Sequence, residues 1–535
     1  KKPGISLAIL EKGLPVSYKS YGYANLEYGI QNSRNTLFNA TDLAKQITIF
    51  SILLLRDQGK LSVYDPVQKY LPVLAGLPHA ISLKQLMEQT SGLRDAMELA
   101  EWTGHRSGDV ITREDVLDLM TQQRDLNAPP GHQFAYNRTG FVLLTEVVAK
   151  VSGMPFSTFV QKYVFTPLGM HNSVFVNTHT QLVRNKAQAY VMLNDGVQKV
   201  VNHTTFVGGT NLYTSVSDFA KWLRNMSEHR IGKPGFYAYL HEKITPTNGQ
   251  PSNYTAGIFK EDSEGYWRIH LEGFDHGYTG YMMYLPEYDF SLVYFSNDLD
   301  FPINDINPVL WDWFNTDYAI QPPTPFIAPV VKYVSRSARD LHRYTGNYLV
   351  GDNFDLRKVT LENDTLFYVR NATNRSPLLP TSEKETFKMA FPGNDNIRVT
   401  FKDRGERLEF RVLTAGTGND YLIRGKKFSF YKGKNTVLTG TYRSPELAHT
   451  VSLRTVNDTT QLRLNDQTIL LHQIGENAFL PAANAQVRYV KLQRDREQNI
   501  TGVYLSGGQI KNLFYRLVSQ SSDETSFLGN SSDDD

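Results

Sequence analysis

The sequence has no cysteine among its 535 residues, which excludes disulfide bonds and thiolate catalysis. A chain without thiols suits an oxidising compartment of the cell envelope. Long apolar runs are missing too. The longest stretch, residues 47–55, is interrupted by Thr48 and Ser51, and it is far shorter than the roughly 18 apolar residues that a membrane helix needs. We therefore expect no transmembrane segment.

An excess of charge and the usual cofactor motifs are also absent. The net charge is +2, which excludes bulk electrostatic attraction to nucleic acid or anionic lipid. The 13 histidines show neither His-x-x-x-His nor His-Glu-x-x-His spacing, so no zinc site is predicted. The run Gly208-Gly209-Thr210 lacks the lysine of a phosphate-binding loop. No cofactor and no metal is expected.

Aromatic residues are abundant, with 30 Tyr and 29 Phe, and this favours a large content of β structure. Residues 1–325 mix strand-like segments with amphipathic helices. The pattern predicts a helix over residues 42–58 that stops at Gly59. It also predicts two neighbouring strands over residues 282–285 and 290–295, joined by a short turn.

A proline-rich segment at residues 321–329 breaks regular structure and marks a domain boundary. Beyond it, short alternating runs are typical of all-β barrels. This part contains a repeat with an offset of 94 residues. The pattern Thr-Gly-x-Tyr ends at Tyr348 and again at Tyr442. The pattern Asn-Asp-Thr starts at Asn363 and again at Asn457. The sequence predicts a first domain over residues 1–325, two small barrels over 335–427 and 428–520, and an acidic polar tail over 521–535.

Six short segments of the first domain carry a family pattern, including Asp-Gln-Gly-Lys-Leu at 57–61 and Thr-Ser-Gly-Leu at 90–93. The segments lie at residues 21–26, 52–61, 65–72, 90–93, 139–144 and 167–170. Together they resemble the β-lactamase-related serine hydrolases, a group with class C β-lactamases, penicillin-binding proteins and D-aminopeptidases. The resemblance implies an α/β domain with helices packed on an antiparallel sheet. In some relatives lipocalin-like barrels follow, so the expected fold is this α/β domain followed by two small all-β barrels.

The first motif of that family is Ser-x-x-Lys at the start of a buried helix, where the lysine takes the proton as the serine attacks a carbonyl. Here Asp42 stands at the serine position and Lys45 at the lysine position. An acyl group transferred to Asp42 would form a reactive anhydride rather than an ester, which argues against acyl transfer. An Asp42–Lys45 ion pair one turn apart is the simpler interpretation. Thr41 is an alternative hydroxyl, although its direction would differ by about 100° around a helix.

The other two motifs are altered as well. In Tyr-x-Asn the tyrosine relays protons and the asparagine holds the substrate amide; this chain keeps Tyr136 but has Arg138 in place of the asparagine. A packed tyrosine with a satisfied hydroxyl is the alternative interpretation of Tyr136. In His/Lys-x-Gly only Gly273 remains, and close backbone approach would be reason enough to keep it. A one-residue slip in this loop would recruit His270 instead.

Three motifs on three separate segments therefore depart from the family pattern, and loss of the nucleophile alone costs on the order of a million-fold in turnover. We predict that no residue is catalytic and that the chain is a binding or assembly subunit of the bacterial cell envelope, in the periplasm or on the cell surface. The expected partner is another protein of an envelope complex. The old cleft, lined by Asp42, Lys45, Tyr136 and Arg138, would hold a small molecule or peptide.

Two alternatives stay open from the sequence. In the first, the chain is an enzyme with changed chemistry, in which Asp42 and Lys45 form an acid/base pair and Tyr136 relays protons. In the second, the barrels bind an apolar small molecule in an aromatic interior, and the first domain only supports them.

Overall fold

The computed structural model describes most of the chain up to residue 519. The residues outside the description are 107, 194–195, 240–241, 243, 249–251, 256, 264–265, 300, 302–330, 352–353, 372–373, 391–395, 414–419, 434–435, 484 and 520–535. The predicted proline-rich boundary at 321–329 and the predicted tail at 521–535 lie outside the described residues. The chain forms two compact units, one of Lys1–Met97 with Arg106–Phe326 and the other of Glu98–His105 with Ile327–Asp535.

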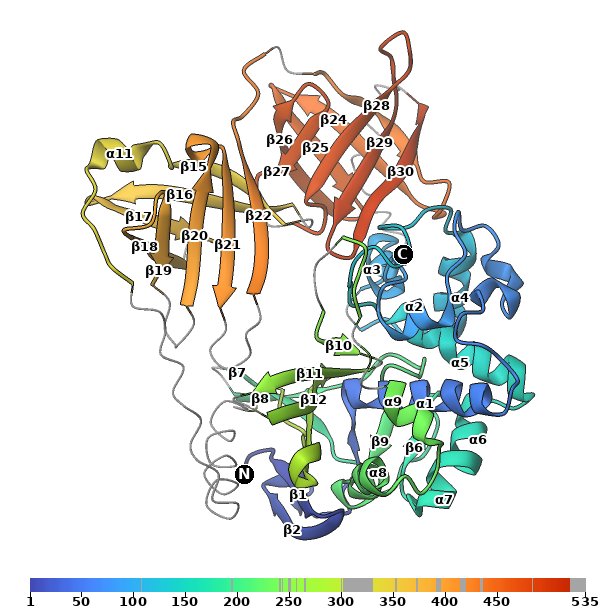
Figure 1. Cartoon of the computed structure of the whole chain (residues 1–535). Helices are drawn as coiled ribbons and strands as arrows, with labels where there is room; N and C mark the ends of the chain where they lie inside the picture. The colour runs from blue at the N-terminus through green and yellow to red at the C-terminus, as the bar shows by residue number, and fades with distance from the viewer. Residues whose placement is uncertain are drawn as a thin grey trace. The chain divides into compact units, whose positions relative to one another are not determined.

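The first unit is built on a seven-stranded antiparallel sheet (Figure 1). Its strand order is β10-β11-β12-β13-β14-β1-β2, so β1 at the start of the chain pairs with β14 near the end of the unit. The predicted pair of strands is confirmed, since β13 and β14 form a hairpin. The strands are β1 (Ile5–Glu11), β2 (Leu14–Tyr21), β10 (Tyr254–Thr255), β11 (Ile258–Ser263), β12 (Tyr266–Asp275), β13 (Tyr278–Leu285) and β14 (Phe290–Ser296).

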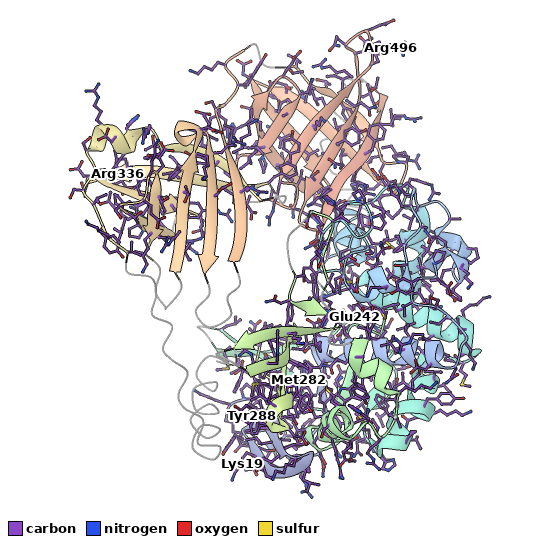
Figure 2. All side chains as sticks on the ribbon, in the orientation of Figure 1. Lys19, Glu242, Met282, Tyr288, Arg336 and Arg496 are labelled. Carbon is purple, nitrogen blue, oxygen red and sulfur yellow. The ribbon has the colours of Figure 1, made fainter. Side chains whose placement is uncertain are left out.

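The helix predicted over residues 42–58 is confirmed, with a short 3-10 turn, η1 (Thr41–Leu43), leading into α1 (Ala44–Asp57). Almost every residue of α1 is buried, because the helix packs against α5 (Thr139–Ser152). Gln46 of α1 contacts the sulfur of Met282 on β13 at 2.7 Å; Met282 is labelled in Figure 2. A second helix, α8 (Val216–Glu228), packs on β1 and β14.

Shorter elements complete the first unit. They are the helices α2 (Leu83–Met87), α4 (Arg113–Gln122), α6 (Phe156–Val160), α7 (Thr166–Leu168) and α9 (Pro234–Tyr239), and the strands β3 (Tyr23–Asn25), β4 (Ile30–Gln31), β5 (Phe38–Asn39), β6 (Val174–Phe175), β7 (Ala189–Leu193), β8 (Gly196–Val200) and β9 (Leu212–Thr214). Helix α3 (Ala96–Trp102) begins in the first unit, and from Glu98 on it belongs to the second. Within the described residues no single helix is long and apolar enough to cross a membrane; by length and composition alone, the pair Thr139–Ser152 and Phe156–Leu168, bent by 72°, passes that test.

The second unit contains two closed barrels of eight antiparallel strands each, drawn in yellow to orange and in red in Figure 1. The predicted fold class is thereby confirmed. The first barrel consists of β15 (Gly346–Val350), β16 (Asp355–Glu362), β17 (Thr365–Val369), β18 (Arg375–Pro380), β19 (Thr386–Met389), β20 (Asn396–Lys402), β21 (Arg407–Leu413) and β22 (Asp420–Phe428). The second consists of β23 (Thr439–Arg443), β24 (Thr450–Val456), β25 (Thr459–Leu464), β26 (Gln467–Gly475), β27 (Ala478–Pro481), β28 (Tyr489–Arg494), β29 (Ile500–Gly507) and β30 (Ile510–Ser519).

The two barrels repeat the same local structure at the predicted offset. Asn363-Asp364 turns the chain between β16 and β17, and Asn457-Asp458 does so between β24 and β25. All four residues have positive φ, at 46° and 59° in the first barrel and 48° and 60° in the second. Asn and Asp tolerate this left-handed backbone, which two-residue hairpin turns require. The repeated Asn-Asp motif therefore forms the same hairpin turn in each barrel.

Candidate functional site

Asp42 lies in η1, which packs against strand β12 of the sheet. Thr41 has a φ of 52°, its N–H donates to Asn39 Oδ1 at 3.0 Å, and its hydroxyl donates to the carbonyl of Ala40 at 2.8 Å. A Cβ on Gly273 would lie 2.6 Å from the amide nitrogen of Asp42, and it would collide with Thr41 Oγ1 as well. Gly273 is therefore required for the close approach of β12 to the turn that carries Asp42, as one interpretation of the sequence held.

Asp42, Lys45 and Tyr136 form a closed set of contacts. Lys45 Nζ lies 3.1 Å from Asp42 Oδ1 and donates to the Tyr136 hydroxyl at 2.5 Å. The Tyr136 hydroxyl in turn donates to Asp42 Oδ1 at 2.6 Å. The ammonium also lies over the Tyr136 ring, 3.8 Å from its centroid. The Asp42–Lys45 ion pair that the sequence predicted is present, and Tyr136 is its third member.

The protonation of this set follows from its burial. Only 1% of the Lys45 side chain and 19% of the Asp42 side chain are exposed. Burial lowers the pKa of the Lys45 ammonium, and the carboxylate of Asp42 opposes part of this shift. Burial, together with the charge of Asp42, raises the pKa of Tyr136 well above its ordinary value. The phenol therefore keeps its proton and donates a hydrogen bond to the carboxylate of Asp42.

Arg138 lies beside a second, buried carboxylate that the sequence did not reveal. Its backbone N–H donates to Asp95 at 2.9 Å, and its guanidinium Nη2 lies 3.9 Å from Asp275 Oδ1. Burial disfavours the charge of Arg138, but the neighbouring acidic groups, Asp275 first among them, together outweigh burial and raise the pKa of the guanidinium. Arg138 therefore stays charged at the position where the family pattern has a neutral amide.

Asp275 has three partners among the described residues. His276 Nδ1 lies 2.7 Å from Oδ1, Thr210 donates its hydroxyl to Oδ2, and Arg138 supplies a positive charge. Burial alone would raise the pKa of Asp275, but the contact with His276 and the charge of Arg138 hold it below its usual range. The signal for Asp275 was present in the sequence, because it lies two residues after Gly273 and therefore on the same face of β12.

The same alternation places His270 away from the site. His270 and Gly273 are an odd number of residues apart in a regularly paired strand, so their side chains point to opposite faces of the sheet. The His270 ring packs instead near Phe259 and Tyr281, at centroid distances of 5.8 and 6.4 Å. The one-residue slip that would recruit His270 is therefore wrong.

Thr41 does not supply a substitute nucleophile either. Its side chain is fully buried, its hydroxyl is committed to the Ala40 carbonyl, and it abuts the β12 and β13 glycines. The partners of Lys45 Nζ are Asp42 and Tyr136. The hydroxyl of Thr41 therefore lacks the neighbouring base that attack on a carbonyl would need.

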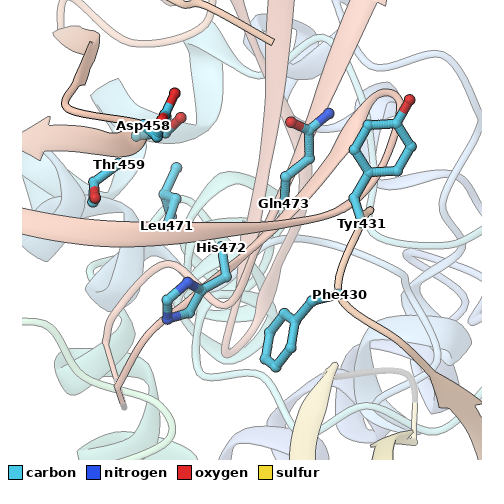
Figure 3. Close-up of a pocket in the computed structure, with 8 residues that line it drawn as sticks. Phe430, Tyr431, Asp458, Thr459, Leu471, His472 and Gln473 are labelled. Carbon is cyan, nitrogen blue, oxygen red and sulfur yellow. The ribbon is translucent and has the colours of Figure 1, made fainter. Parts of the chain in front are cut away.

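Aliphatic and aromatic side chains form the buried core of the first barrel. Tyr344, Phe387 and Phe401 are all buried and contact one another at centroid distances of 4.6 to 5.5 Å. In the second barrel a pocket of about 190 Å³ lies beside β25 and β26 (Figure 3). Mainly polar and aromatic side chains, with one leucine, line it: Phe430, Tyr431, Asp458, Thr459, Thr460, Leu471, His472 and Gln473. These features do not favour the alternative of an apolar ligand inside a barrel.

No group of three or more potential metal ligands occurs among the described residues.

Replacing Gly273 by alanine should destabilise the first unit by about 1–3 kcal/mol, because the atoms that the new methyl group meets belong to backbone and to a buried hydroxyl. Urea unfolding of the purified protein measures this effect. Gly235→Ala is the matched control, since Gly235 is exposed and its nearest neighbour is the flexible end of Arg56 at 3.7 Å. Equal stability of the two variants would contradict the close approach of β12 to Asp42.

Comparisons with known proteins agree with the fold of the first unit. Residues 1–309 match the family model described as Beta-lactamase. Penicillin-binding protein 4* of Bacillus subtilis is 26% identical over 403 residues, which cover 71% of this chain and 86% of that protein. The D-aminopeptidase of Gluconobacter oxydans is 26% identical over 261 residues, 48% of each protein, so the chain spans about half of that relative.

Among solved structures, the octameric penicillin-binding protein homologue from Pyrococcus abyssi aligns with a TM-score of 0.55. The alignment has 23% identity and covers 79% of this chain and 96% of that one. At this identity the likeness shows the fold alone. Together with the family match, it supports the serine-hydrolase type of architecture that the motifs of the first unit indicated.

Proposed function

The chain belongs to the Beta-lactamase family, and from that premise we propose that it is a member without acyl-transfer activity that binds a ligand in the cleft around Asp42. One observation carries this proposal: a carboxylate occupies the nucleophile position, and its Oδ1 accepts the Tyr136 hydroxyl at 2.6 Å and pairs with Lys45 at 3.1 Å. The set that would activate a serine hydroxyl is used here to stabilise a negative charge.

The chemistry of the set argues in the same direction. A base that accepts the proton of a nucleophile must be unprotonated, whereas Lys45 as an ion-pair partner of Asp42 carries its proton. An acylated Asp42 would be an anhydride, which water hydrolyses readily. Arg138 adds a second charge where the family pattern has a neutral hydrogen-bonding side chain. The site therefore consists of paired charges, which suit recognition.

We assign this binding function to the bacterial cell envelope, in the periplasm or on the cell surface, with another protein as partner. The absence of cysteine suits an oxidising compartment. The relatives named as penicillin-binding proteins support the same location. To test whether a protein partner exists, the chain is purified from its native source under mild conditions. Mass spectrometry then identifies the proteins that elute with it.

A panel of model substrates tests the lack of catalysis. We expect the purified protein to hydrolyse a nitrophenyl ester, a chromogenic cephalosporin and an amino-acid nitroanilide no faster than buffer does. The matched control is Tyr136→Phe, which removes the proton relay and should leave these background rates unchanged. Saturable hydrolysis that Tyr136→Phe abolishes would refute the proposal.

Such a result would favour the second candidate function, an enzyme that uses Asp42 and Lys45 as an acid/base pair. The observation in its favour is the lowered pKa of Lys45, because burial brings the ammonium closer to a pH at which it can exchange its proton. A pH–rate profile then distinguishes the two functions. If Asp42 and Lys45 act as an acid/base pair, the hydrolysis rate should rise as Lys45 loses its proton, and the hydrolysis should disappear in Asp42→Ala.

A further inference from the structure

The pocket of about 190 Å³ on the second barrel is formed by three separate segments of the chain. The segment between β22 and β23 contributes Phe430 and Tyr431, and β26 contributes residues 471–473. The hairpin turn at Asp458 and the start of β25 contribute the rest. Figure 3 shows Asp458 and Thr459 at one end and Phe430 and Tyr431 at the other, with the β26 side chains between them.

The segment that carries the two aromatic residues is fastened to β26 by Gln473. The backbone N–H of Tyr431 donates to the carbonyl of Gln473 at 2.9 Å. The buried side chain of Gln473 accepts the N–H of Thr436 at 3.0 Å and donates to the Thr436 hydroxyl at 3.1 Å. A Cβ on Gly433 would lie 2.5 Å from Cζ of Tyr431, so the ring is in close contact with the chain that follows it. This wall of the pocket is therefore preformed, which spares a ligand the cost of ordering it.

The aromatic residues of this wall leave much of their surface uncovered. Phe430 is 49% exposed and Tyr431 is 36% exposed. The rings of Phe430 and His472 lie edge to face, with their centroids 5.3 Å apart, in an arrangement that aromatic pairs prefer. Since the face of an aromatic ring carries partial negative charge, it attracts the weakly positive C–H groups of a ligand. The pocket therefore offers an apolar platform to a ligand with a C–H face.

Polar groups with both hydrogen-bonding roles surround this platform. The carboxylate of Asp458 accepts several hydrogen bonds, and the hydroxyls of Thr459 and Tyr431 donate as well as accept. Neither of these two hydroxyls has a partner in the described part of the chain. The register of β25 and β26 pairs Thr460 with Leu471, so the preceding Thr459 lies opposite His472, on the same face of the sheet. A ligand that both donates and accepts hydrogen bonds matches this set.

The charge and the size of the pocket restrict the ligand further. The described residues that line it include neither lysine nor arginine, so an anionic ligand would meet the carboxylate of Asp458 without a lining cation to hold it. An apolar ligand would bury that carboxylate and the hydroxyls without hydrogen bonds, which is costly. The volume of about 190 Å³ is below the roughly 300–1,000 Å³ of sites for drug-sized molecules. A single neutral pyranose ring meets all of these conditions, since it has a C–H face and a rim of hydroxyls.

We propose that the pocket binds one neutral pyranose ring of a saccharide, with the C–H face of the sugar on Phe430 and Tyr431 and hydroxyls of the sugar donating to the Asp458 carboxylate. This binding site goes beyond the proposed function and does not rest on it. A free sugar and the end of a longer glycan present the same ring, so the pyranose is the ligand chemistry that the site recognises.

Saturation-transfer NMR titration of the full chain tests the proposal. The probes are glucose, galactose, mannose and N-acetylglucosamine, each as the free sugar and as its methyl glycoside. At least one should bind saturably, and the acyclic polyol sorbitol should bind about tenfold more weakly or worse, because it lacks a preformed C–H face. Equal affinity of the free sugar and the glycoside supports a glycan end as the ligand, and loss of binding in the glycoside supports a free sugar. Binding of no pyranose, or equal binding of sorbitol, would overturn the proposal.

Two variants place the sugar in the pocket. Asp458→Asn keeps a residue that tolerates the positive φ of 60°, and it should weaken binding about fivefold or more, because the hydrogen bonds lose their charged acceptor. Phe430→Leu keeps apolar bulk without the ring face and should weaken binding about threefold or more. Asp364→Asn is the matched control: Asp364 occupies the corresponding turn of the first barrel, with a φ of 59°, and does not line the pocket. This control should bind like the unaltered protein.

Two further results would contradict the assignment. Affinity that both pocket variants leave unchanged would show that the sugar binds elsewhere. Tetramethylammonium carries C–H groups and a positive charge but no hydroxyl, so it is the probe for recognition of a cation by the aromatic rings. Tighter binding of this ion than of any pyranose, weakened by the same two variants, would make the pocket a cation site. Because Phe430 and Asp458 are exposed, all three variants should unfold at the same urea concentration as the unaltered protein.

Discussion

Asp42→Ala should lower the free energy of unfolding by about 3 kcal/mol near pH 6, because removing one partner of a buried ion pair leaves the other charge uncompensated. The charge left behind is the Lys45 ammonium, of which 1% is exposed. Its remaining neighbours, the Tyr136 hydroxyl and the faces of the Tyr136 and Phe141 rings, do not replace a full negative charge.

The penalty should shrink as the pH rises. In the folded protein burial holds the pKa of Lys45 below its ordinary value, which is about 10.4 in the unfolded chain. Between the two values the unfolded state binds more protons, so stability increases with pH in that window. Removal of Asp42 lowers the folded pKa further and extends the window downward. The difference between variant and unaltered protein is therefore largest at low pH and decreases toward pH 10.

Urea unfolding at intervals from pH 5 to pH 10 measures this dependence. The double variant Asp42→Ala/Lys45→Met should be more stable than Asp42→Ala alone, because the stranded charge is gone. Lys69→Ala breaks the exposed Asp65–Lys69 pair and should change little, as surface ion pairs do. A penalty that is the same at pH 5 and pH 10 would show that Lys45 is not the group left unpaired.

Asp42→Ser should convert the protein into one that forms a covalent acyl adduct. The new hydroxyl would lie beside Lys45 and Tyr136, in the arrangement by which a lysine takes the proton of an attacking serine. Without the Asp42 carboxylate the pKa of Lys45 falls, so more of the lysine is available as a base. The backbone needs no change, because the turn at Thr41 and the approach of Gly273 are already in place.

The size of this gain can be bracketed. Loss of a nucleophile costs on the order of a million-fold, and loss of one stabilising donor, as at Arg138, costs about a hundred- to a thousand-fold. The acylation rate of Asp42→Ser should therefore exceed that of the unaltered protein by roughly a thousand-fold or more. Asp42→Ala is the matched control, since it removes the same charge and supplies no hydroxyl. An adduct in both variants would show that the label reacts elsewhere.

The sequence predicted the fold class through the family pattern, and it predicted the Asp42–Lys45 ion pair through local spacing. One helical turn fixes Asp42 and Lys45 together, and the family motif brings Tyr136 to them across 91 residues. The duplicated Asn-Asp turns predicted the two barrels because a hairpin turn with positive φ limits the residues it accepts.

Local spacing and family motifs do not predict contacts between segments that are distant in the sequence. Thr210 meets Asp275 only because the loop before β9 lies beside β12, and no spacing in the sequence encodes that contact. Strand alternation would have excluded His270, had the register of β12 been known. The exposure of Arg138, and with it the availability of its guanidinium, depends on packing that a motif does not record.

Intact-mass spectrometry after incubation with a fluorophosphonate and with benzylpenicillin tests most directly whether a carboxylate has ended acyl transfer in this cleft. We expect an unchanged mass for the unaltered protein and a single adduct, mapped to position 42, for Asp42→Ser. A stoichiometric adduct on the unaltered protein within the cleft would contradict it, because a reactive nucleophile would then remain beside Lys45.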